Sequence, residues 1–161
     1  MARDAAETAE GWRFLGPARY DLAGLYHMLI NKLNFAKIGV STDNNTPVTL
    51  PDEDDDYMMV FAQNTRCSGR GFIFTPMAKL DDGMFDFICV KKANVLRNIM
   101  LFEKVKADGG HVEDPVVYHI QLKEMTLATK DSKDLVGIDG EVNVNTPIKV
   151  EACKGVFETL V

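Results

Sequence analysis

A chain of 161 residues, of which 46% are hydrophobic and 26% charged, predicts one globular domain that is large enough to bury a hydrophobic core. Its formal charge of −6 argues against the clustered basic face of a nucleic-acid-binding protein. The apolar runs are too short to cross a bilayer, and residues 1–10 lack the apolar core of a secretory signal. Because the three cysteines, Cys67, Cys89 and Cys153, are widely spaced, we expect free thiols and a cytoplasmic location.

The first third of the chain predicts one helix, one strand and one loop. Residues 1–11 are polar and alanine-rich, and we expect them to be frayed. Apolar residues recur at helical spacing over 21–35, and a short strand is expected at 37–41. Residues 43–56 combine prolines, asparagines and aspartates, which predicts a solvated acidic loop. A calcium loop at these aspartates is disfavoured, because the glycine and the final glutamate of that motif are both missing.

Beyond the loop, short runs rich in aromatic and β-branched residues predict strands, separated by glycine, proline and aspartate. They cover 57–63, 71–75, 84–91, 116–122, 124–129, 135–138, 148–152 and 156–161. A second helix is expected over 94–107, with Asn94 as its N-cap and Asp108-Gly109-Gly110 as its end. This order of short strands and two helices predicts an antiparallel β-sandwich, in the mainly β or α+β class.

Two Asp-Gly segments place carboxylates at turns. Asp81 and Asp82, followed by Met84, favour a hairpin turn, although adjacent carboxylates with turn carbonyls would also suit Mg²⁺ or Ca²⁺. At Asp139-Gly140 a second turn precedes a strand that begins with Glu141. A carboxylate fixed at the start of a strand could act as a general base or hold nucleotide-bound magnesium, and a solvated polar edge is the alternative.

Two further segments contain candidate functional residues. Residues 12–20, Trp-Arg-Phe-Leu-Gly-Pro-Ala-Arg-Tyr, place Arg13 and Arg19 among aromatic residues ahead of the first helix. Guanidinium groups bind phosphate bidentately, and arginine stems packed on aromatic faces are the alternative. His111 lies in a glycine-rich turn after the second helix, where a single histidine is rarely a base or a ligand. The sequence has no Walker phosphate loop, no Gly-x-Ser-x-Gly elbow and no protein-kinase catalytic loop.

In their order and spacing these motifs resemble the second, C-terminal domain of the sphingosine kinase and diacylglycerol kinase family. The resemblance covers 12–161, with 43–56 as an acidic insertion. It rests on residues 12–20, 60–64, 75–86 and 106–113, and on Asp139-Gly140-Glu141 followed by Pro147. Its Gln-Asn and Gly-His-Val-Glu details are more similar to sphingoid-base kinases than to bacterial diacylglycerol kinases.

This resemblance implies transfer of the ATP γ-phosphoryl group to a lipid hydroxyl, with ATP and Mg²⁺ as cofactors. The reaction would take place between an N-terminal α/β domain and this β-sandwich. Glu141 would bind the magnesium–ATP phosphates or deprotonate the lipid hydroxyl. Arg19 would contact phosphate, with Arg13 assisting. Asp82, with Asp81 and the Met84 carbonyl, would match the structural metal site of bacterial relatives.

The glycine-rich phosphate motif of the family has no counterpart in this sequence, so we expect the isolated chain to be inactive. It would then be half of a kinase for a sphingoid base or diacylglycerol, completed by an N-terminal domain in cis or in trans. Its partners would be the lipid and that domain, with membrane contact peripheral at most. A non-catalytic lipid-binding or regulatory module is the alternative, and an interaction domain whose matches are only turns is a third interpretation.

Overall fold

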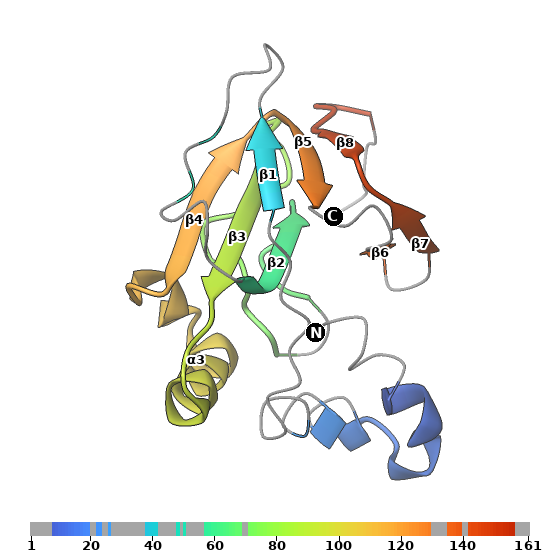
Figure 1. The fold of residues 1–161 in the computed structure, drawn as a ribbon, viewed down its shortest axis with the longest axis vertical. Coiled ribbons are helices and arrows are strands. Elements are labelled where there is room, and N and C mark those ends of the chain that lie inside the picture. Colours follow the sequence, from blue (N-terminus) through green and yellow to red (C-terminus); the bar gives the residue numbers. More distant parts are fainter. Residues whose placement is uncertain are drawn as a thin grey trace.

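The architecture is described by a computed structural model (Figure 1). The structure describes residues 8–19, 22–23, 26, 38–41, 48, 50, 57–68, 71–129, 135–139 and 142–156. Its elements are η1 (Arg13–Leu15), β1 (Ile38–Ser41), β2 (Tyr57–Gln63), β3 (Phe85–Lys91), α3 (Val95–Ala107), η2 (Gly110–Glu113), β4 (Val117–Leu122), β5 (Glu124–Thr129), β6 (Leu135–Ile138), β7 (Val142–Asn145) and β8 (Ile148–Glu151). Most of the predicted helix at 21–35, nearly all of the acidic loop at 43–56 and all but the first residue of the predicted strand at 156–161 lie outside the described residues.

Two three-stranded antiparallel sheets form the body of the domain, in the orders β2–β3–β4 and β1–β5–β8. Strands β6 and β7 pair separately as a hairpin, with Ile138 opposite Val142. The predicted antiparallel sandwich is therefore confirmed, and so is a strand after Asp139, which the structure describes from Val142.

The core between the two sheets is apolar. From β3 come Phe85, Phe87 and Cys89, which alternate along the strand and so share one face. They meet Met125 and Leu127 of β5, and all five side chains are buried. Alternating side chains from two facing sheets interdigitate in this way in β-sandwiches, so this core fixes how the sheets pack.

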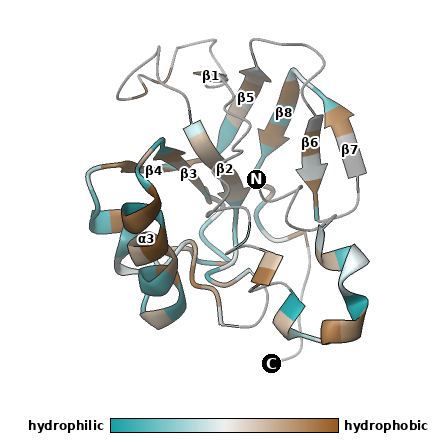
Figure 2. Ribbon diagram, turned by 60° about the horizontal axis from the view of Figure 1, so that its bottom comes forward, coloured by the Kyte–Doolittle hydropathy of each residue, from teal (hydrophilic) through white to brown (hydrophobic). Residues whose placement is uncertain are grey.

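Helix α3 covers the other face of the β2–β3–β4 sheet, on the side away from β5 and β8 (Figure 2). Leu101 of α3 joins Met58, Ile88 and Val90 in a second hydrophobic cluster. The predicted N-cap is confirmed, because the side-chain oxygen of Asn94 accepts a hydrogen bond from the Arg97 N–H at 2.9 Å. The sheet therefore lies between α3 and the second sheet.

The predicted strand at 71–75 is wrong, because this segment is an irregular part of the connection between β2 and β3. Its polar groups are satisfied by contacts distant in sequence. The Thr75 hydroxyl donates to the Thr65 carbonyl at 2.6 Å and accepts from Gln63 Nε2 at 2.6 Å, while the Ile73 N–H donates to the Val105 carbonyl at 2.9 Å. A hairpin turn at Asp81-Asp82-Gly83 is therefore also wrong, because β3 pairs with β2 instead.

Candidate functional site

The Asp81-Asp82-Gly83 turn brings the three predicted metal-site residues together immediately before β3. Asp82 Oδ1 accepts a hydrogen bond from the Met84 N–H at 2.8 Å, so this carboxylate stabilises its own turn. Gly83 has a φ of 76°, and a Cβ at this position would lie 3.1 Å from Lys154 Cβ. Within the described part of the chain, no group of three acidic, histidine or cysteine side chains could hold a metal ion. The metal site at this turn stays a prediction.

The second Asp-Gly segment begins at Asp139, directly after β6. Asp139 adopts a φ of 49°, which lies in the left-handed region that a tight turn requires. The hairpin is held to the body of the domain because Val136 of β6 packs against the core between the sheets. Glu141, the predicted catalytic carboxylate, and Gly140 lie outside the described residues. The role of Glu141 is therefore still a prediction.

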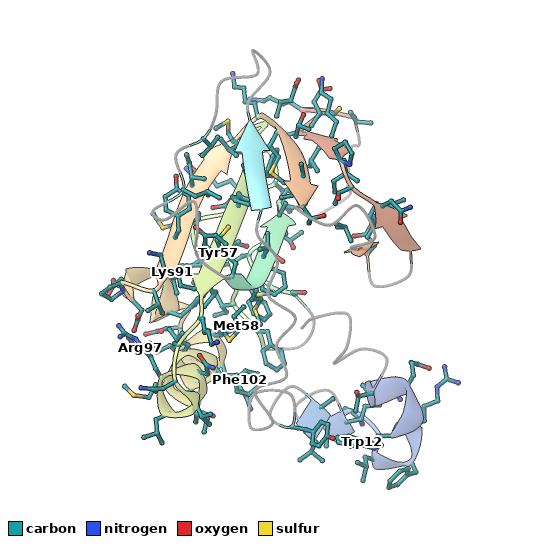
Figure 3. The ribbon with its side chains drawn as sticks, viewed as in Figure 1. Trp12, Tyr57, Met58, Lys91, Arg97 and Phe102 are labelled. Atoms are coloured by element: carbon teal, nitrogen blue, oxygen red, sulfur yellow. The ribbon has the colours of Figure 1, made fainter. Side chains whose placement is uncertain are left out.

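The two predicted phosphate-binding arginines lie in the N-terminal helical region. Arg13 Nη2 contacts Glu10 Oε2 at 2.6 Å, with 72% of the Arg13 side chain exposed, so this guanidinium already forms a surface ion pair. Arg19 is half-buried. Nearby, the rings of Trp12 and Tyr26 meet edge to face at 5.7 Å. Figure 3 shows Trp12 well separated from Phe102 and Arg97 of α3.

A cluster of half-buried aromatic residues lies between β2, the 71–75 segment and α3, and the sequence analysis did not predict it. The ring of Phe74 lies 4.8 Å from that of Phe61, and the ring of Phe72 lies 5.5 Å from that of Phe102. Lys106 Nζ lies 5.7 Å from the centre of the Phe102 ring. The Phe-Ile-Phe run was the signal for this cluster, but its alternation was interpreted as a strand.

On the α3 side, the sheet also contains a buried carboxylate that the sequence analysis did not single out. Asp86, only 1% exposed, lies on the central strand β3. Its Oδ1 lies 2.5 Å from His119 Nε2, and its Oδ2 accepts from Gln121 Nε2 at 3.4 Å. Both partners come from β4, where Gln121 pairs directly with Asp86. The register of these two strands therefore gives a buried carboxylate two polar partners, without which its burial would be costly.

His111 is buried as well, in the turn that leads from α3 into η2. It is 2% exposed and packs edge to face against Phe74, with 6.4 Å between ring centres. Burial lowers the pKa of the His111 imidazole below its usual value, so the neutral ring is favoured. The position therefore combines a packing role with a titratable group.

Comparison with known protein families shows to which family this domain belongs. Residues 2–161 match the family model described as "YegS C-terminal NAD kinase beta sandwich-like domain". The chain belongs to this family. The prediction is thus confirmed to this extent: the chain is a C-terminal, β-sandwich-like domain of the YegS type.

Solved structures share the fold of this YegS C-terminal domain. Three of them come from Bacillus anthracis str. Sterne: two are described as a "putative diacylglycerol kinase" and one as a diacylglycerol kinase. Their TM-scores are 0.59, 0.57 and 0.55, with 24%, 24% and 20% sequence identity over 81%, 82% and 81% of this chain. The chain spans only 41%, 44% and 43% of their lengths.

No curated protein sequence matches this YegS C-terminal domain significantly. Among the described residues, no helix is long and apolar enough to cross a membrane. The family assignment rests on the family model, and the shared fold rests on the solved structures.

Proposed function

We propose that this domain is the C-terminal half of an ATP-dependent lipid kinase that phosphorylates the hydroxyl group of a sphingoid base or of diacylglycerol. The family match over residues 2–161 carries this proposal. The fold shared with proteins described as diacylglycerol kinases supports it, and this chain covers less than half of their length. An N-terminal domain in cis or in trans would supply the main nucleotide site, and without it we expect no activity.

The lipid side of the proposed site is the aromatic cluster under α3. Phe61, Phe72, Phe74 and Phe102 are all half-buried, so their rings offer apolar surface that is not already used in the core. Rings of this kind contribute large apolar contact areas at little cost in conformational entropy. They would contact the hydrocarbon chain of the substrate and leave its hydroxyl group toward the missing domain.

The phosphate side would use the charged residues of the remaining motifs. Glu141 would accept the proton of the lipid hydroxyl or hold the magnesium–ATP phosphates, and Arg19 would contact a phosphate oxygen. Arg13 would assist after leaving Glu10, its present partner at 2.6 Å. Bound Mg²⁺ neutralises phosphate charge, which is the main requirement of phosphoryl transfer. If a structural ion is bound, Asp82 and Asp81 with the Met84 carbonyl would hold it.

A non-catalytic lipid-binding module is the second candidate. The aromatic cluster favours it as much as it favours the kinase, because lipid contact requires no phosphate chemistry. The sequence of this chain also lacks a glycine-rich phosphate motif. The kinase would require the Glu141 carboxylate for phosphate transfer, whereas the lipid-binding module would not require it.

The test compares the native polypeptide that contains this chain with the 161-residue chain alone. The native polypeptide is captured from its source cells with an antibody and assayed for phosphate transfer from ATP to sphingosine and to diacylglycerol in mixed micelles. We expect one lipid to be phosphorylated by the native polypeptide and neither by the isolated chain. Which lipid reacts identifies the substrate class.

Variants of the same polypeptide then separate the two candidates. Glu141→Gln should lower the rate by about a hundredfold or more, as expected for loss of a general base. Glu151→Gln, an exposed glutamate of β8, is the matched control and should leave the rate unchanged. Phe102→Ala should mainly raise the KM for the lipid. Lipid binding that depends on Phe102, without phosphorylation of either lipid, would replace the kinase by the binding module.

A further inference from the structure

The segment Phe72–Pro76, here called the aromatic loop, lies directly on the turn where α3 ends. The Ile73 N–H donates to the Val105 carbonyl at 2.9 Å. At Gly109, whose φ is 84°, a Cβ would lie 2.8 Å from Ile73 Cγ2 and 3.0 Å from Pro76 Cβ. The aromatic loop and this helix turn, residues Val105–His111, therefore pack at a distance that leaves no room for water.

His111 lies at the centre of this contact. Its imidazole meets the ring of Phe74 edge to face, at an interplanar angle of 83°. Neither ring nitrogen makes a hydrogen bond of standard geometry with any residue that the structure describes, although both are buried. A buried polar ring in this state is tolerated best when it is uncharged.

The groups that face His111 oppose a positive charge on its ring. Lys104 approaches from α3 and His119 from β4, and both lower the pKa of His111 in addition to its burial. The carbonyl oxygens of Phe74 and Gly109 act in the other direction, but burial is the largest effect. Asp86 on β3 is engaged by His119, and Asp108 Oδ1 accepts from the Gly110 N–H at 2.8 Å. The aromatic loop itself carries no charged residue.

We infer that His111 is an acid-sensitive switch that releases the aromatic loop from the helix turn when its ring gains a proton. The carbonyl oxygens of Phe74 and Gly109 do not meet the ring at standard hydrogen-bond geometry, and separation of the aromatic loop admits water as a better acceptor for the protonated ring. Among the described residues, the core between the two sheets contains no histidine, so we expect it to stay closed. If the proposed function is correct, release of the aromatic loop also moves Phe72 and Phe74, which contact the lipid. Only this effect on the lipid contact rests on the proposed function.

The direction of the pH effect follows from the lowered pKa of His111. The closed loop is fully favoured above the usual histidine pKa of 6.5, where the ring is neutral in both states. As the pH falls below 6.5, the open state binds the proton first, and closure weakens until the lower pKa of the closed state is reached. At about pH 5.5 the open state is favoured by up to about tenfold relative to about pH 7.5.

The test is amide hydrogen exchange of the 161-residue chain at these two pH values, with each rate divided by its intrinsic rate. We expect the protection factor of the Ile73 amide to fall by about five- to tenfold at the lower pH, while amides of β3 keep theirs. Equal protection of Ile73 at both pH values would overturn the switch. An equal loss of amide protection in β3 would also overturn the switch, because the whole domain would then be opening.

Two variants and one spectrum assign the effect to this ring. His111→Phe should abolish the pH dependence at Ile73, whereas His119→Gln, the matched histidine control, should retain it. The opposite pattern would refute the assignment. If His111→Phe does not fold, histidine NMR of the unmodified chain decides: the His111 resonance must titrate below 6.5, and a midpoint at or above 6.5 contradicts the switch. None of these measurements depends on kinase activity.

Discussion

The two faces of the β2–β3–β4 sheet differ in what they bury. Toward the β1–β5–β8 sheet lie apolar side chains such as Phe85 and Phe87, which meet Met125 of β5. Toward α3 the buried residues include Asp86, Asn98 and His111 beside Ile88 and Leu101. One sheet therefore has an apolar core on one side and a mixed layer on the other.

The difference indicates which layer stabilises the domain and which layer can open when a buried group changes its protonation. Close-packed apolar contacts have no protonation states and tolerate few alternative arrangements. In the mixed layer, each buried polar group depends on a partner. Asp86 has His119 and Gln121, whereas Asn98 Oδ1 and the His111 ring nitrogens make no hydrogen bond of standard geometry with any described residue. Such groups cost stability, and they allow this layer to open while the apolar core remains closed.

The largest loss of stability is expected in the apolar core. Phe87→Ala removes a fully buried ring and should lower the free energy of unfolding by about 4 kcal/mol, through lost burial and the cavity that remains. Urea denaturation followed by circular dichroism measures this change. Phe87→Leu, which keeps most of the volume, is the control and should cost much less. A loss below about 1 kcal/mol for the alanine variant would mean that this core is loosely packed.

Sequence patterns predicted the strands and the helix better than the contacts between them. Strands β2 and β5 have the predicted bounds, 57–63 and 124–129, because alternation is a local signal. Helix α3 likewise follows from its Asn94 cap and apolar spacing. The pairing of Asp86 with His119 joins residues 33 positions apart, and it depends on the β3–β4 register, which no local pattern specifies.

The irregular segment at 71–75 shows the same limit. Its Phe-Ile-Phe alternation is that of a strand, but its Ile73 N–H and Thr75 hydroxyl bind Val105 and Thr65 instead of a neighbouring strand. Tertiary contacts override strand propensity here, as is usual for short apolar segments. For the candidate site, the sequence placed Asp81, Asp82 and Met84 in one turn, and the aromatic cluster could not be predicted because it requires this loop conformation.

In the mixed layer the largest effect is expected at Asp86. Asp86→Ala removes a buried carboxylate that contacts His119 at 2.5 Å, and it should lower the free energy of unfolding by about 3 kcal/mol, because the half-buried His119 ring loses this partner. Glu124→Ala is the matched control. Glu124 contacts Lys149 at 2.7 Å, but 58% of the lysine side chain is exposed, so the loss should stay below about 1 kcal/mol. Equal losses in the two variants would contradict the distinction.

A smaller effect is expected where the aromatic loop meets the helix turn. Gly109→Ala should lower the free energy of unfolding by about 2 kcal/mol. The alanine must adopt a left-handed φ, and its Cβ presses on Ile73 and Pro76. The control is Gly155→Ala. Gly155 has a φ of 72°, and no described atom lies within 4 Å of a Cβ built there, so this variant should lose only the stability that the backbone strain costs. Denaturation measures both variants. If both lose the same stability, the loop does not pack on Gly109 as described.

The smallest effect concerns the start of α3. Asn94→Ala removes the side-chain oxygen that accepts from the Arg97 N–H at 2.9 Å and should lower the free energy of unfolding by about 1 kcal/mol. Asn94→Asp keeps this acceptor and adds a negative charge to a first turn that has no acidic residue, so it should be as stable as the unmodified protein or slightly more stable.

Hydrogen exchange shows where the Asn94→Ala loss is felt. Amides of α3 should lose protection while those of β5, in the apolar core, keep it, because the helix can fray without opening the sandwich. An equal loss of protection in both places would mean that the two layers unfold as one unit. The mixed layer could then not open by itself, and the contrast between the two faces of the sheet would be one of composition only.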